Sequence, residues 1–327
     1  MRFSSDPMSL KSIFESRSPS ATFPRVAFIA SLLTVLVGCS RFNYVLPDSP
    51  NALSRIPPIS PPPKIALVLG SGGPRGYAHI GVMQVLEQAG IPYDLVVGSS
   101  VGSLIGAFWA SGLNADQIDA LSKTGGPLTL FDFSLFADRG WIHGQRLQDY
   151  VNDRINEGQI EKLPKNFIAV ATRVADKKPV FFQTGNVGVA VRASSAVSGV
   201  FSPVGIQGVE YEDGDESLPV AVRAARQAGA QFVIAVDVAP RLKDAPPSTS
   251  VYRLARETTR RHRIDPELLA ADFVNQPDIG FKTSPSAAFF VKTRQAGEDS
   301  TRAALPALTQ ALTKSAMPML PKIVSSQ

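Results

Sequence analysis

The alternation of apolar runs with amphipathic segments gives the first indication of the fold. Residues 65–69 form a continuous apolar run of strand length, which is typical of a strand covered on both faces of a sheet. A helix is predicted over 78–89, because apolar residues recur on one face and Gly90 provides a stop. A second apolar run at 95–97 then leads into a glycine-rich turn and another helical pattern.

The rest of the chain continues this alternation. A capping box formed by Asn114 and Gln117 predicts a helix that runs to Lys123. Because strand and helix patterns alternate, we expect an α/β fold: one domain built as a three-layer α/β/α sandwich with a mainly parallel central sheet. Further strands are predicted at 167–172, 179–183, 232–237 and 272–277, and further helices at 219–228 and 299–312.

The N-terminal residues resemble a lipoprotein leader. A 12-residue apolar run, Val26–Val37, follows Arg25; it is shorter than the roughly 20 residues that span a bilayer and fits the hydrophobic region of a secretory signal. It ends in Leu-Val-Gly-Cys39, which resembles the lipobox of bacterial lipoproteins and implies cleavage before Cys39 and lipidation of its thiol. Ser40 at the next position suggests the outer membrane, with the protein facing the periplasm.

A proline-rich stretch separates this leader from the first predicted strand. Residues 41–63 contain seven prolines, which remove backbone donors and favour extended conformations. We therefore expect a signal peptide at 1–38, a lipidated cysteine and tether at 39–63, the folded domain at 64–315 and a tail at 316–327.

Composition excludes several classes of protein. The formal charge of +5 over 327 residues is too mild for a nucleic-acid-binding surface. A single cysteine excludes an internal disulfide framework or a cysteine-based metal site. The oligomeric state is left open.

Two segments have an unusual local composition. Residues 125–144 concentrate aromatic side chains, for which we expect core packing, with an apolar cover over a lipid site as the alternative. A basic run is predicted to lie on a helix, where a solvated face is expected and contact with anionic lipid headgroups is the alternative. This run comprises Arg253, Arg256, Arg260, Arg261 and Arg263.

A turn between a predicted strand and helix carries the first candidate for chemistry. Gly98-Ser99-Ser100-Val101-Gly102 has the Gly-x-Ser-x-Gly pattern. Such a turn strains the serine backbone and exposes its hydroxyl above the sheet. Gly98 and Gly102 permit the tight turn, and the N–H of Val101 lies unpaired at the helix N-terminus. Ser100 is therefore the candidate nucleophile.

The glycine loop after the first strand supplies candidate donors for an oxyanion. Gly72 and Gly73 let their N–H groups turn toward a tetrahedral oxygen, whereas Pro74 has no N–H. Arg75 adds a positive charge that holds the loop or offsets the developing anion. A dinucleotide site is disfavoured because no acidic residue ends the second strand, and a P-loop because no Gly-Lys-Ser/Thr follows.

The residues alone offer two candidates for the base. Asp213 precedes Gly214 in a turn that can aim a carboxylate into a pocket. A conventional order of Ser100, Asp237 and His262 is the alternative, although His262 lies within a run of arginines that disfavours its protonation. His79 lies on the first helix and is expected to be a packing residue.

The motifs together resemble the patatin-like lipolytic acyl hydrolases. The glycine loop at 72–76, the serine turn at 98–102 and Asp213-Gly214 occur in the order that this family shows, and the resemblance covers roughly residues 64 to 315. Further stretches that match are 76–81, 192–196, 201–204 and 296–298.

The resemblance implies a function and a set of roles. The family hydrolyses acyl esters of lipids, in the manner of a phospholipase, lipase or esterase, with a Ser–Asp dyad and without a metal or cofactor. Ser100 would be the nucleophile and Asp213 the base, while Gly72, Gly73 and Arg75 would form the oxyanion hole.

Two residues depart from the family pattern. Ser71 stands where the motif has its first glycine, and Asp215 stands where the family often has Gly or Ala. Asp215 is expected to raise the pKa of Asp213 if both carboxylates point inward. The alternative from another class is a catalytically silent, membrane-anchored scaffold that keeps the fold and binds lipid.

Overall fold

The computed structural model describes residues 43–124, 130–156 and 158–317. The predicted signal peptide, Cys39 and most of the predicted tail lie outside the described residues. The strands are β1 Asn43–Tyr44, β2 Ala52–Leu53, β3 Ile65–Leu69, β4 Leu95–Ser99, β5 Asn166–Arg173, β6 Pro179–Phe182, β7 Val204–Ile206, β8 Val209–Asp213, β9 Phe232–Val236 and β10 Phe273–Asn275.

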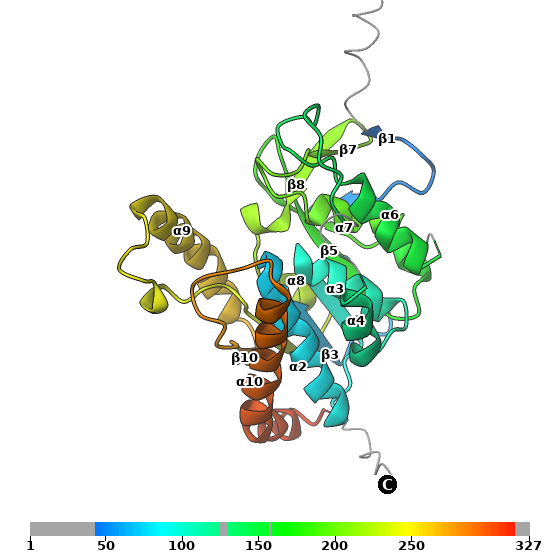
Figure 1. Cartoon of the computed structure of the whole chain (residues 1–327). Helices are drawn as coiled ribbons and strands as arrows, with labels where there is room; N and C mark the ends of the chain where they lie inside the picture. Colours follow the sequence, from blue (N-terminus) through cyan, green and yellow to red (C-terminus); the bar gives the residue numbers. More distant parts are fainter. Residues whose placement is uncertain (1–42, 125–129, 157, 318–327) are drawn as a thin grey trace, which may run out of the picture. The chain divides into compact units, whose positions relative to one another are not determined.

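The helices occupy the connections between these strands (Figure 1). The α-helices are α2 Tyr77–Gln88, α3 Val101–Ala110, α4 Ala115–Ser122, α6 Gln145–Arg154, α7 Val187–Ser194, α8 Val222–Gln227, α9 Val251–Leu268 and α10 Ala287–Lys314. Short 3-10 helices are η1 Gly73–Gly76, η2 Ile160–Lys162, η3 Gly214–Glu216 and η4 Leu242–Asp244.

The sheet has a parallel centre, which confirms the predicted fold class. Strands β5, β4, β3, β9 and β10 are neighbours in that order, and each pair is parallel. The continuous apolar runs of β3, β4 and β9 are buried at every position, as expected for strands that are covered on both faces.

Successive residues of the central strands point into two different hydrophobic cores, one on each face of the sheet. The sheet and the helices on its two faces form the three layers. Leu67, Val96 and Ile234 belong to the core that is covered by α2, α3, α4, α6, α7 and α10. Their neighbours Val68 and Val97 belong to the core that is covered by α8, by α9 and by the segment around Ile56. The period of two in a strand sends successive side chains to opposite faces.

The antiparallel part of the sheet meets the parallel part on β5. Ser99 of β4 pairs with Val170 of β5, and Asp213 of β8 pairs with Ala171, the next residue along β5. Both of these β5 residues also pair with β6, so β4 and β8 share the opposite edge of β5. Because β4 runs parallel and β8 antiparallel to β5, their C-terminal ends meet at this point. The two turns that follow them are therefore side by side.

The predicted spacer is wrong over residues 43–63, because this segment packs on the domain. Its β1 pairs with β7, and its β2 pairs with β6. The Tyr44 hydroxyl donates to Gln145 Oε1 at 2.9 Å, and Ile56 is 2% exposed. Proline-rich sequence excludes regular ladders over long stretches, but it leaves room for two short strands and for apolar side chains that fill the core.

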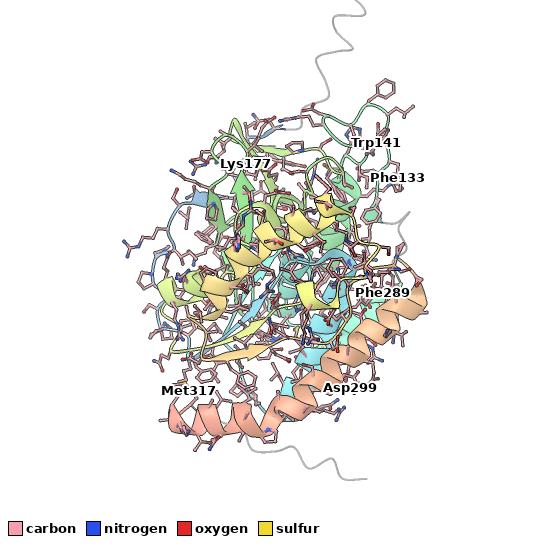
Figure 2. All side chains as sticks on the ribbon, turned by 90° about the vertical axis from the view of Figure 1, so that its left-hand side faces the viewer. Phe133, Trp141, Lys177, Phe289, Asp299 and Met317 are labelled. Carbon is pink, nitrogen blue, oxygen red and sulfur yellow. The ribbon has the colours of Figure 1, made fainter. Side chains whose placement is uncertain are left out.

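Three other predictions need correction. The segment 219–228 forms only the short helix α8, and the last helix, predicted over 299–312, begins at Ala287, where the Ser286 side chain caps it. The expected core packing of the aromatic segment holds for Phe131, which lies against the core, but not for Phe133, Phe136 and Trp141, which are 61%, 83% and 64% exposed. Figure 2 shows Phe133 and Trp141 at the periphery of the side chains.

Within the described ranges, no helix combines the length and the apolar composition that crossing a bilayer requires.

Candidate active site

Ser100 lies between β4 and α3 with a backbone conformation that is rare for a residue with a side chain. Its φ is 56° and its ψ is −124°, a region in which non-glycine residues are strained. Helix α3 approaches the sheet so closely that a Cβ at Gly102 would lie 2.1 Å from the Leu69 carbonyl oxygen. A Cβ at Gly98 would likewise clash with the backbone of Gly102. The glycines are therefore required at these positions by close packing.

Hydrogen bonds from neighbouring elements hold this turn. The Ser100 N–H donates to Ser194 Oγ at 2.9 Å, and the Ser194 hydroxyl donates to the Val170 carbonyl at 2.5 Å. The Ser103 hydroxyl donates to the Ser100 carbonyl at 2.7 Å. Ser194, at the end of α7, links the turn to β5. The sequence signal for it was the matching stretch 192–196, whose role no local pattern revealed.

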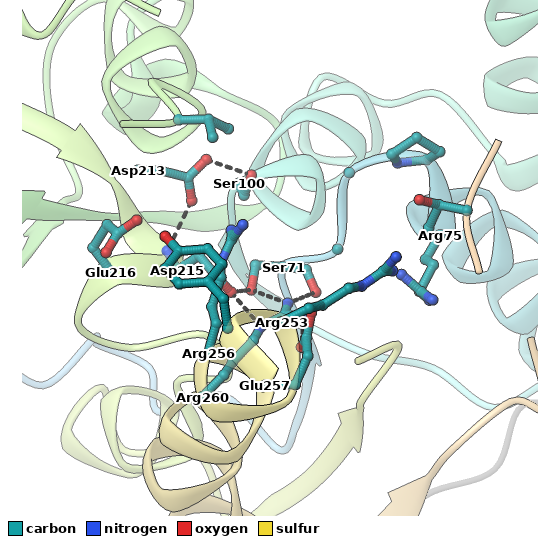
Figure 3. A pocket seen from close by; sticks show the side chains of 16 residues that line it. Ser71, Arg75, Ser100, Asp213, Asp215, Glu216, Arg253, Arg256, Glu257 and Arg260 are labelled. Atoms are coloured by element: carbon teal, nitrogen blue, oxygen red, sulfur yellow. Dashed lines mark hydrogen bonds and ion pairs between the residues drawn. The ribbon is translucent and has the colours of Figure 1, made fainter. Parts of the chain in front are cut away.

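Asp213 lies within hydrogen-bond distance of Ser100. The Ser100 hydroxyl donates to Asp213 Oδ2 at 2.7 Å, and the Asp215 N–H donates to the other carboxylate oxygen at 2.8 Å (Figure 3). Asp213 is 2% exposed and Ser100 is 6% exposed. This contact follows from the end-to-end meeting of β4 and β8 on β5, since each residue ends or directly follows its strand.

The environment of Asp213 makes its carboxyl unusually basic. The pKa of Asp213 is raised from 3.8 to about 7, first by burial and then by the charge of Asp215. The Asp215 N–H, the Ser100 hydroxyl and Arg260 oppose this shift without cancelling it. A carboxylate with a pKa near neutrality is matched to proton transfer from a hydroxyl at physiological pH.

The two departures from the family pattern contact each other. The Ser71 hydroxyl donates to Asp215 Oδ1 in a short hydrogen bond. Arg260 of α9 joins both, since its Nε donates to Asp215 Oδ1 at 2.7 Å and its Nη2 to the Ser71 carbonyl at 2.8 Å. The expected solvated face of the basic helix is therefore wrong for Arg260, which is 8% exposed. This network ties the glycine loop to the turn that carries Asp213.

The glycine loop leads into η1 next to Ser100. Gly73 has a φ of +53°, in the left-handed region that favours glycine. Gly73 is also the first residue of η1, and the first N–H groups of a helix have no intrahelical acceptor. Gly72, Gly73 and Ser100 line the same pocket.

Arg75 lines the same pocket and also contacts the loop at 280–281. Its Nη2 donates to the carbonyls of Gly280 at 3.2 Å and Phe281 at 2.5 Å. Burial lowers the pKa of Arg75 to about 10, so it remains a cation at neutral pH. Of the two predicted roles, the contacts favour fixing a loop, here 280–281, over contact with a developing anion.

The alternative triad is not assembled. The Asp237 carboxylate accepts from Arg261 Nη1 at 2.5 Å, from Gln276 Nε2 at 2.8 Å and from the Ala239 N–H at 2.9 Å. His262 is exposed on α9. His79 is buried and its Nε2 lies 2.8 Å from the Gly70 carbonyl oxygen, in agreement with the predicted packing role; burial lowers its pKa to about 4.

Ser100 and Asp213 line a pocket of about 490 Å³. Its walls come from the glycine loop, the turns after β4 and β8, and helix α9 (Figure 3). A pocket of this size suits a small organic substrate or one segment of a larger one.

Comparison with known proteins agrees with this arrangement. A family model described as patatin-like phospholipase matches residues 67–222, which span the glycine loop, the serine turn and Asp213. VipD from Legionella pneumophila, at 14% identity, superposes with a TM-score of 0.52 over 84% of this chain and 73% of its own. This likeness extends to the fold alone.

Relatives with higher identity carry the name NTE. An uncharacterised NTE-family protein of Mycobacterium tuberculosis is 36% identical over 212 residues, 60% of this chain and 57% of that protein. Lysophospholipase nte1 of Aspergillus fumigatus is 32% identical over 181 residues, 53% of this chain and 12% of that protein. This chain thus spans little more than half of the first relative and a small part of the second. Residues 67–222, which contain the glycine loop, the serine turn and Asp213, are therefore similar to the patatin-like phospholipase family.

Proposed function

We propose that this protein is a serine acyl hydrolase that cleaves acyl esters of membrane lipids with a dyad of Ser100 and Asp213. The observation that carries the proposal is the 2.7 Å hydrogen bond from the Ser100 hydroxyl to Asp213 Oδ2. Three further features support the proposal: the strained backbone of the serine turn, the raised pKa of Asp213 and the adjoining pocket. These are the parts that nucleophilic catalysis needs.

The geometry supports a two-step reaction. Ser100 Oγ forms a bond to the carbonyl carbon of the ester while Asp213 accepts the hydroxyl proton. Collapse of the tetrahedral intermediate breaks the bond to the alcohol, which takes the proton from Asp213 and leaves. A water molecule then attacks the acyl-enzyme while Asp213 accepts its proton. Collapse of this second tetrahedral intermediate breaks the bond to Ser100 Oγ, which takes the proton back from Asp213, and the fatty acid is released.

The oxyanion is assigned to backbone donors. In this proposal the N–H groups of Gly72 and Gly73 face the tetrahedral oxygen, and the N–H of Val101 at the start of α3 adds the positive end of a helix. Each such donor contributes about 3 kcal/mol to transition-state stabilisation. Arg75 contributes indirectly, because it fixes the loop at 280–281 against the glycine loop.

The location of the activity is a further part of the proposal. We place the domain at a bacterial outer membrane, facing the periplasm and anchored through lipidated Cys39. The sequence Leu-Val-Gly-Cys39 supports this placement, which otherwise stays a prediction.

A covalent label tests the proposed nucleophile. Incubation with a fluorophosphonate probe, which reacts with activated serine hydroxyls, is expected to give a single adduct. Peptide mass spectrometry is expected to locate it at Ser100. Absence of any adduct, together with no hydrolysis of p-nitrophenyl butyrate, would favour the silent lipid-binding scaffold.

The raised pKa of Asp213 predicts a pH profile. Since only the ionised carboxylate accepts a proton, kcat/KM for p-nitrophenyl butyrate should rise with pH and level off above about 7. Asp215→Asn removes the neighbouring negative charge, so the rise in kcat/KM should occur at lower pH in this variant. Glu216→Gln serves as the control, because Glu216 is not among the groups that shift Asp213. If kcat/KM of Asp215→Asn rises at the same pH as that of the unsubstituted chain, this account of the site is contradicted.

A further inference from the structure

Helix α9 presents a row of arginines to the pocket. Arg253, Arg256 and Arg260 follow one another at intervals of three and four residues, so they share one face of the helix. All three line the pocket that contains Ser100 and Asp213. Figure 3 shows them extending from α9 on the same side as Asp215 and Ser71. This face is therefore part of the site.

The three arginines differ in how far their donors are already used. Arg260 is held by Asp215 and by the Ser71 carbonyl. Arg253 donates to the Phe281 carbonyl at 3.2 Å, and its guanidinium carbon lies 4.9 Å from the centre of the Phe281 ring. Arg256 is exposed, and its side chain makes no hydrogen bond or ion pair with any residue in the described ranges. Arg256 is thus the guanidinium whose donors are available to a ligand.

Within the described ranges, none of the carboxylates that line the pocket forms an ion pair with Arg256. Asp215 and Glu257 both pair with Arg260, at 2.7 Å and 3.6 Å. Asp213 accepts from Ser100. Glu216 is the remaining acidic residue of the lining. Any transient pairing between partly exposed Glu216 and exposed Arg256 is weak, so it competes poorly with a phosphate that a guanidinium can hold through two parallel hydrogen bonds.

We propose that Arg256, assisted by Arg253, forms an anion subsite that binds the phosphate of an acyl ester while Ser100 attacks its carbonyl carbon. The subsite makes the hydrolase selective for lipids whose alcohol part carries a phosphate over neutral glycerides. This inference rests on the proposed function, because it assigns the phosphate to a substrate of Ser100. Arg256 acts on substrate specificity, and the chemistry stays with the dyad.

A pair of substrates that differ only in the phosphate tests the inference. We would measure kcat/KM for 1-oleoylglycerol 3-phosphate and for 1-oleoylglycerol, both in the same detergent micelles. The full chain is expected to prefer the phosphorylated ester. Arg256→Gln should lower kcat/KM for this ester by about tenfold to a hundredfold, the range for a lost hydrogen bond to a charged group. Its kcat/KM for 1-oleoylglycerol should stay within about twofold.

Two further variants separate a direct contact from a general effect of charge. Arg256→Lys, which keeps the cation but not the two-pronged geometry, should recover part of the lost preference. Lys282→Gln removes an exposed positive charge next to Thr283, which lines the pocket, while Lys282 itself does not. It should leave the preference unchanged. An equal loss in Lys282→Gln and Arg256→Gln would overturn the subsite.

The outcomes also distinguish this inference from the proposed function. Hydrolysis of p-nitrophenyl butyrate by all variants, with no preference for the phosphorylated glyceride in the unsubstituted chain, would overturn the subsite and leave the hydrolase intact. Inhibition of that hydrolysis by inorganic phosphate, without lipid preference, would assign the arginines to a free anion and overturn the lipid assignment. Failure to hydrolyse any ester would instead contradict the proposed function itself.

Discussion

Ser100→Ala is expected to abolish ester hydrolysis, with a fall in kcat for p-nitrophenyl butyrate of about 10⁴-fold or more. A serine nucleophile that acts together with its base accounts for most of the rate, so that removal of either partner disables both. In the structure the hydroxyl is the atom that reaches both Asp213 Oδ2 and the pocket. The measurement is initial velocity at saturating ester, with labelling by the fluorophosphonate probe in parallel.

Ser99→Ala is the matched control for this substitution. Ser99 is the residue before Ser100, it is equally buried, and its hydroxyl has no hydrogen-bond partner in the described part of the chain. Its removal is expected to change kcat by less than about threefold, because no reacting atom depends on it. Comparable losses in both variants would show that folding of the turn is being measured. Full activity in Ser100→Ala would contradict the dyad.

Asp213→Asn is expected to lower kcat by about 10³-fold. Asparagine keeps the size of the side chain and can still accept the hydrogen bond from the Asp215 N–H, but it cannot take a proton from Ser100. Loss of a positioned general base costs between about 10² and 10⁴ in rate. The measurement is kcat over a range of pH, in which the variant should also lose the rise that levels off near pH 7.

Asp213→Asn is also expected to raise the stability of the folded chain at neutral pH. The folded-state pKa of Asp213 is about 7 and its ordinary value is 3.8, so the folded chain holds a proton that the unfolded chain has released between these values. The stability of the unsubstituted chain therefore falls as pH rises from about 4 to 7. Asp213→Asn should become the more stable protein across that window and stay so above it, as followed by urea unfolding. The opposite trend would contradict a buried carboxyl group with a raised pKa.

His262→Ala provides the control for the alternative triad. His262 is exposed and Asp237 is already bound by Arg261, Gln276 and the Ala239 N–H. Its replacement is expected to leave kcat within about twofold. A loss as large as that of Asp213→Asn would revive the triad of Ser100, Asp237 and His262.

Local patterns identified the parts of the site that are continuous in sequence. The serine turn is a strand, a tight turn and a helix within a few residues, and each is visible as an apolar run or a glycine. The glycine loop is of the same kind. Asp213 was found by its Asp-Gly turn together with the order of the three motifs, whereas its carboxyl alone could not be separated from Asp237.

Patterns were less informative where contacts join distant segments. Arg260 appeared as one of five arginines on a solvated face, yet its guanidinium holds Asp215 and Ser71. Ser71 and Asp215 appeared as two separate departures from the family, yet they contact each other. Residues 43–63 appeared as a spacer, because proline density reports on backbone freedom and carries no information about which edge strand a short segment can join.

The sequence by itself determined the alternation of strands and helices, the serine turn and the identity of the chemistry-bearing side chains, because these depend on residues that are neighbours in the chain. Only the tertiary structure decided that β4 and β8 end at adjacent residues of β5, which brings a hydroxyl and a carboxylate together across 113 positions of sequence. It also decided that α9 turns its arginines toward them. The physical reason is that strand register and helix docking are set by the packing of the whole core.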